Sequence, residues 1–290
     1  MTTSSSWAAT LPAPPRPRIG LGLILVLPAL AAIVLLYALP LVRSLLGAFH
    51  DGDGFTLANV SRAATLYGRD VMFSIGVSLG SLALIAAVSI AIAGYLTLGA
   101  TPWAVRALRW LYRWPLFIPF VVAGQLSRSF LSTNGMMNTA LVESGLMAAE
   151  SAQSFLDWRG LILTFAWKQI PFVTLLLAGA MAAVDTSHSE AARNLGGGRL
   201  RCLFQIVLPQ AAPTLWVGLI LSLVAMLSVL SVPMMLLSGN PTMMTAMMAH
   251  RITYYGDYGV ANALGLFSYA LTAVSAWVYL RLTLARETRR

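Results

Sequence analysis

The chain has 290 residues and a formal charge of +9, with 58% of its residues hydrophobic and only 10% charged. A soluble domain is about a quarter charged, so this chain has too few polar groups to cover a surface in water and is expected in a lipid bilayer. In a membrane protein, an excess of basic residues reports orientation and does not indicate nucleic-acid binding. The single cysteine excludes an intrachain disulfide and a cysteine-cluster metal site.

The first residues, 1–19, are rich in Ser, Ala and Pro and predict a disordered cytoplasmic tail. They do not form a convincing secretory signal, because the charges follow a polar stretch and no small-residue cleavage site ends a short apolar core. Residues 20–282 are expected to form one transmembrane domain, and residues 283–290 a basic cytoplasmic tail.

Apolar segments follow one another along the chain, each long enough to cross a hydrocarbon core of about 30 Å. We place the spans at 20–42, 71–98, 111–130, 160–184, 214–237 and 260–282. Each should be a helix, because a single backbone in lipid has to satisfy its own hydrogen bonds. The predicted fold is therefore an all-α integral membrane protein with about six transmembrane helices.

Arginines are distributed unevenly between the two sets of loops that alternate along the chain. Twelve lie in the set that contains both termini and the loop between the fourth and fifth spans, and five lie in the opposite set. Because basic residues stay on the cytoplasmic side, both termini and that loop are predicted to be cytoplasmic. An even number of spans agrees with this orientation.

Three polar side chains inside the spans are candidates for a solute pathway: Lys168, Gln169 and Gln125. Lys168 lies about 12 Å into its predicted helix, near the middle of the bilayer, so it should face protein or water. It either lines the pathway or bonds backbone carbonyls freed by Pro171, and the sequence leaves both open. Gln125 and Gln169 could equally form hydrogen bonds between helices. Arg128 is expected to extend its charged end to the membrane surface.

No acidic residue is placed deep in any span, and no internal repeat is visible. Both observations weigh against an ion-coupled secondary transporter. The three histidines fall in loops and no His-Glu-x-x-His motif occurs, which weighs against an intramembrane metalloprotease.

The most informative segment is residues 190–209, EAARNLGGGRLRCLFQIVLP, in the basic loop between the fourth and fifth spans. It predicts a short helix over 186–195 capped by Ser189 or Thr186, a turn at the glycines, and a second helix from Arg199 toward Pro209. The pattern of this segment is carried by seven residues at fixed distances from one another along the chain: Glu190, Ala191, Ala192, Gly196, Ile206, Leu208 and Pro209.

This spacing resembles the EAA loop of the membrane subunits of binding-protein-dependent ABC importers, of the MetI-like class, and the resemblance covers roughly residues 65–282. It implies a permease domain in a bacterial inner membrane, whose EAA loop (185–213) inserts into a groove on a separate ATPase. It also implies two ATP-binding subunits, a second permease subunit that is a copy or a paralogue, and an extracytoplasmic substrate-binding protein. The alternative is an amphipathic helix at the membrane surface with no protein partner.

The chain itself has no Walker A motif, which requires Gly-x-x-x-x-Gly-Lys-Ser/Thr, and its single lysine is Lys168. We therefore expect a transport subunit that is not an enzyme and holds no cofactor, with ATP bound by its partners.

The substrate is indicated only weakly. Sugar-type members commonly carry Asp where EAARNLGG has Leu195, so the chain is more similar to the branch that serves polyamines, thiamine, iron(III) and phosphonates. The stretches WKQIPF (167–172) and YGDYGVANALG (255–265) also resemble that branch. We expect a small organic solute, polyamine-like or related. The alternatives are a sugar importer permease and, more distantly, an ion-coupled secondary transporter.

Overall fold

The computed structural model describes residues 19–52, 54–194, 196–237, 239 and 241–287. The predicted N-terminal tail therefore lies outside the described residues up to residue 18. Of the predicted C-terminal tail, the part up to Glu287 belongs to the last helix and residues 288–290 lie outside the described residues.

A first compact unit extends to Leu46. Its described part is one continuous helix made of α1 (Ile19–Ile33), the π turn η1 (Val34–Ala38) and α2 (Leu39–Gly47). The π turn ends just before Pro40, and the Leu39 N–H donates to the Val34 carbonyl five residues back. This wider turn keeps the proline ring away from the carbonyl that it would otherwise meet in an α-helix.

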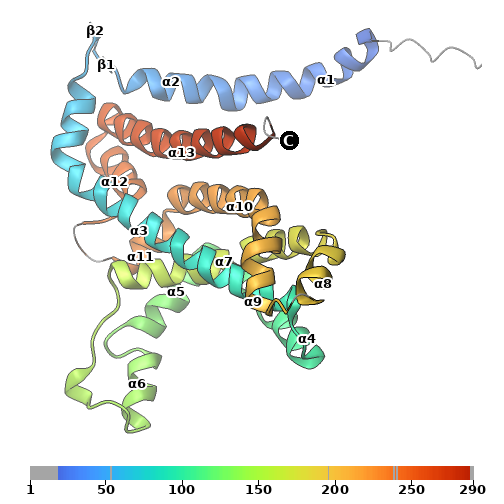
Figure 1. The fold of residues 1–290 in the computed structure, drawn as a ribbon. Coiled ribbons are helices and arrows are strands. Elements are labelled where there is room, and N and C mark those ends of the chain that lie inside the picture. The colour runs from blue at the N-terminus through green and yellow to red at the C-terminus, as the bar shows by residue number, and fades with distance from the viewer. Residues whose placement is uncertain (1–18, 53, 195, 238, 240, 288–290) are drawn as a thin grey trace, which may run out of the picture. The chain divides into compact units, whose positions relative to one another are not determined.

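The second unit begins at Gly47 and contains the rest of the chain (Figure 1). It opens with a small antiparallel hairpin of β1 (His50–Asp51) and β2 (Gly54–Phe55). The elements that follow within the described residues are helical: α3 (Ala58–Leu98), α4 (Pro102–Leu111), η2 (Trp114–Phe117), α5 (Phe120–Leu131), α6 (Met136–Glu143), η3 (Ala149–Ser151), α7 (Trp158–Ala182), α8 (Thr186–Asn194), α9 (Arg199–Cys202), η4 (Leu203–Val207), α10 (Leu208–Ser228), α11 (Ser231–Leu236), α12 (Met244–His250), η5 (Arg251–Tyr255) and α13 (Tyr258–Glu287).

The core of this unit lies where α3, α7 and α10 pack against one another. Ile85, Phe165 and Met226, one from each helix, are fully buried there. Helix α3 also buries a series of small hydroxyl residues, which let helices approach closely in a membrane; they are Ser74, Ser78, Ser81 and Ser89.

Five helices in the described residues are long and apolar enough to cross a membrane: Val26–Gly47, Ala58–Leu98, Trp158–Ala182, Arg199–Ser228 and Tyr258–Arg281. They overlap five of the six predicted spans and confirm the all-α membrane fold. The remaining predicted span, 111–130, is wrong as a single helix. Pro115 and Pro119 divide that segment, since each lacks an N–H, and Ile118 before Pro119 is extended.

Candidate functional site

The first half of the loop between the fourth and fifth predicted spans forms the short helix α8, and Asp185 caps its start. Its carboxylate accepts a hydrogen bond from the Ser187 backbone N–H at 2.9 Å. This bond lowers the pKa of the Asp185 carboxyl, and nearby His188 contributes in the same direction. The prediction of Thr186 or Ser189 as the cap is therefore wrong. An Asp directly before the helical stretch was the signal that could have found it.

The end of α8 is formed by glycines, as predicted. Gly196 has a φ of +82°, and the Gly197 N–H donates to the Ala192 carbonyl at 2.8 Å. A left-handed residue followed by this long return bond is a Schellman motif. A Cβ on Gly197 would lie 2.7 Å from the Ala192 oxygen, so the turn in this conformation requires glycine at 197 as well.

The second half of the loop is not a separate short helix. Helix α9 passes through the π turn η4 into α10, so the helix is continuous from Arg199 to Ser228. The Leu208 N–H donates to the Leu203 carbonyl, five residues back, directly before Pro209. As before Pro40, a π turn accommodates a proline without ending the helix.

The loop is anchored through two side chains of this second helix. Leu203 and Val207 are buried in a small apolar cluster that also contains Ala93 of α3 and Leu177 and Met181 of α7. Gly94 makes the close approach to α3 possible, because a Cβ there would lie 2.7 Å from Leu203.

The seven residues singled out in the sequence are thereby brought to one loop but divide by exposure. Glu190, Ala191, Gly196 and Pro209 are exposed, and Ala192, Ile206 and Leu208 are half-buried. Of the half-buried members, Leu208 packs against the apolar cluster that holds Leu203 and Val207.

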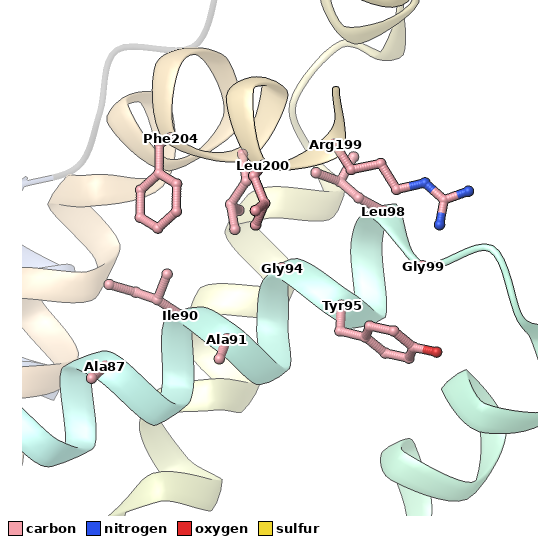
Figure 2. A pocket seen from close by; sticks show the side chains of 11 residues that line it. Ala87, Ile90, Ala91, Gly94, Tyr95, Leu98, Gly99, Arg199, Leu200 and Phe204 are labelled. Atoms are coloured by element: carbon pink, nitrogen blue, oxygen red, sulfur yellow. The ribbon is translucent and has the colours of Figure 1, made fainter. Parts of the chain in front are cut away.

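A cavity of about 440 Å³ lies beside this anchor, between the end of α3 and the second helix (Figure 2). Leu200 and Phe204 lie on its α9 side, facing Ile90, Ala91 and Gly94 of α3. The lining is almost entirely apolar, so it offers little to a polar solute. Within the described residues no group of three or more His, Cys, Asp or Glu side chains could hold a metal ion.

Lys168, a pathway candidate, is buried in α7 and directed at the broken segment before α5. Its Nζ donates to the Leu116 carbonyl at 3.2 Å and lies 5.2 Å from the centroid of the Phe120 ring. The Leu116 carbonyl is at the break caused by Pro119. Lys168 thus caps a carbonyl freed by a proline, but the proline is in another segment and is not Pro171.

The other polar candidates are dispersed. Gln169 is buried beside Lys168 on α7, whereas Gln125 is exposed on α5. Within the described residues no hydrogen bond connects these three side chains. Arg128 is exposed, and its Nη1 donates to the Met235 carbonyl of α11 at 2.7 Å. That its charged end reaches the membrane surface stays a prediction.

Asp70 is a buried polar residue that the sequence interpretation missed. It lies inside α3, one residue before the predicted span and near the first third of this 41-residue helix. That no acidic residue lies deep in the bilayer stays a prediction. Its Oδ1 accepts from the Thr242 N–H at 2.8 Å, and Ser74 Oγ accepts from the Met244 N–H at 2.9 Å. These bonds attach the segment before α12 to α3.

With this geometry established, comparison with known proteins identifies the family. The model of the family described as "binding-protein-dependent transport system inner membrane component" matches residues 18–285. The chain belongs to this family of ABC importer permeases. Its members are transport subunits of the inner membrane, and the loop with α8 and α9 is where the family resemblance was seen in the sequence.

Relatives of the permease serve different solutes. The sulfoquinovosyl glycerol transport system permease protein SmoG of Agrobacterium fabrum is 29% identical over 192 residues, and the match spans 62% of this chain and 62% of SmoG. The molybdenum transport system permease protein ModB of Escherichia coli is 31% identical over 166 residues, which are 56% of this chain and 69% of ModB.

Solved structures show the same fold. A bacterial ABC transporter involved in the import of the acidic polysaccharide alginate matches with a TM-score of 0.75 at 22% identity, over 92% of this chain and 96% of that one. A second structure of a bacterial alginate ABC transporter, in complex with an alginate pentasaccharide-bound periplasmic protein, also has a TM-score of 0.75, at 20% identity over 90% and 93% of the two chains.

Proposed function

We propose that this permease forms half of a solute pathway and is coupled to a separate ATPase through the loop of α8 and α9. The observation that carries the proposal is the fixed, exposed end of α8. Glu190 and Gly196 are exposed, Asp185 and the glycine turn hold the helix at both ends, and Leu203 ties the loop to α3 and α7. Force applied to α8 would therefore reach the membrane helices directly.

The partners follow from the same proposal: two ATP-binding subunits, a second permease that is a copy or a paralogue, and an extracytoplasmic binding protein. ATP is bound by the partners, since this chain has no Walker A motif.

Two glycines of the same turn, Gly196 and Gly198, allow a controlled test of the coupling role. Gly196 has a φ of +82° and Gly198 a φ of −69°, and a Cβ would meet nothing within 4 Å at either position. Gly196→Ala forces a side chain into the left-handed region at a cost of about 1–2 kcal/mol, whereas Gly198→Ala is tolerated. We expect Gly196→Ala, Gly196→Asp and Glu190→Lys to insert normally but to lose co-purifying ATPase and ATP-dependent uptake. Normal assembly and wild-type uptake by either Glu190→Lys or Gly196→Asp would exclude the coupling role.

For the substrate we propose a small organic solute, polyamine-like or related, supported by the EAARNLGG form of the loop and by the similarity to spermidine/putrescine permeases PotB. A sugar is the second candidate, supported by the similarity to SmoG and to the trehalose/maltose permease MalF. Thermal shifts of the partner binding protein with spermidine and with maltose decide between them.

A further inference from the structure

A second cavity, of about 450 Å³, lies at the same ends of α3 and α7 as the loop. It is bounded by the last turn of α3, the last turns of α7 and the turn that follows α4. One side of it is formed by two arginines, Arg109 and Arg113, and the other is apolar and includes Leu96 and Leu175.

The charged side has no acidic partner. Neither Arg109 nor Arg113 forms an ion pair within the described residues, and the sequence contains no Asp or Glu between Asp70 and Glu143. The Arg113 Nε donates to the hydroxyl of Tyr112 at 3.2 Å. That hydroxyl keeps its own proton to donate, and the remaining guanidinium N–H groups of both arginines are left for an anion.

The cavity also lies where a membrane surface is expected. Two candidate spans end beside it, α3 at Leu98 and α7 at Ala182. Helix α4 presents Trp103 and Trp110, seven residues apart on one face, and Trp114 follows; all three are exposed. Exposed tryptophans together with arginines at the ends of spans are typical of the lipid head-group region.

We propose that this cavity binds the head group of an anionic phospholipid, with Arg109, Arg113 and the Tyr112 hydroxyl on the phosphate and the start of an acyl chain against Leu96 and Leu175. One guanidinium group can donate two parallel hydrogen bonds to two oxygens of a phosphate. Basic pockets between membrane helices are suited to anionic lipids. A free phosphate would satisfy the arginines but would leave the apolar side of the cavity empty.

The test uses the full chain purified in detergent and supplied with phosphatidylglycerol and phosphatidylcholine in equal amounts, with bound lipid measured by native mass spectrometry. Wild type should retain phosphatidylglycerol preferentially. Arg109→Gln/Arg113→Gln should lower its retention about tenfold, because two charge-assisted contacts are lost. Arg106→Gln is the matched control, since Arg106 is exposed on the same helix but does not line the cavity.

An equal loss in Arg106→Gln, or no preference of the wild type for phosphatidylglycerol, would overturn the proposal. So would displacement of the lipid by millimolar inorganic phosphate, which would identify a free anion as the occupant. If the double variant does not fold, Arg109→Lys/Arg113→Lys replaces it. This variant should lose part of the preference for phosphatidylglycerol, because lysine cannot donate two parallel hydrogen bonds to one phosphate. The ATPase is absent from this assay, so its result is independent of the coupling role proposed for α8.

Discussion

Lys168 shows how one side chain can stabilise a broken membrane segment. Its ammonium donates to the Leu116 carbonyl, which the break at Pro119 leaves without a helical donor, and it lies over the ring of Phe120. Lys168→Met keeps the length and removes the donor, so it should lower stability by about 1 kcal/mol, the typical worth of such a bond. Thermal unfolding in detergent measures this, with exposed Gln125→Met as the control. A Lys168→Met protein that is more stable and fully active would exclude both a capping and a pathway role.

At the scale of elements, α8 depends on its cap. The bond from the Ser187 N–H holds the pKa of Asp185 below its ordinary value, so the carboxylate stabilises α8 at neutral pH. The stabilisation is complete at a pH above the pKa of Asp185 in the unfolded chain, about 3.9. It is lost as the pH falls through the lower pKa that Asp185 has in the folded protein. Asp185→Ala should therefore speed amide exchange in α8 at pH 7, whereas Asp185→Asn, which keeps an acceptor, should change it little. Equal exchange in wild type and Asp185→Ala would show that the cap does not hold the helix.

The same elements show what the sequence could predict. The loop and its glycine turn were identified because φ > 0 at Gly196 and a helix stop at Gly196–Gly198 are local requirements. The division of 111–130 into separate helices and the burial of Asp70 were not predicted, because hydropathy averages over a window. That average is almost unchanged by two prolines, Pro115 and Pro119. It is equally insensitive to one carboxylate, Asp70, whose partner N–H is distant in sequence. The direction of Lys168 depends on tertiary packing, which no local pattern contains.

At the scale of the whole molecule, some arginines are paired with aspartates and others are not. Arg62, Arg159 and Arg251, on the side expected to face outward, each pair with an aspartate, at 3.9, 2.8 and 3.5 Å. Arg43 and Arg69 on that same side, like the arginines of α4 and α9, form no ion pair within the described residues. The pairing therefore does not distinguish the two sides, and the predicted orientation rests on the arginine count.

Cysteine labelling tests this orientation. The sequence alone suggests the native Cys202 for the cytoplasmic side and the loop positions 138 and 240 for the outer side, but the structure favours others. Cys202 is buried, and so is Asn138, whose amide donates to three backbone carbonyls, while residue 240 lies outside the described residues.

Ser187 and Ser144 are both exposed and lie beyond opposite ends of α7, a helix of 25 residues. At 1.5 Å per residue that helix spans about 37 Å, enough to separate the two serines by a bilayer. In a Cys202→Ala background, Ser144→Cys should react with an impermeant maleimide on intact spheroplasts, and Ser187→Cys only after the membrane is opened. The reverse pattern would invert the topology and would place the α8 loop where no ATPase can reach it.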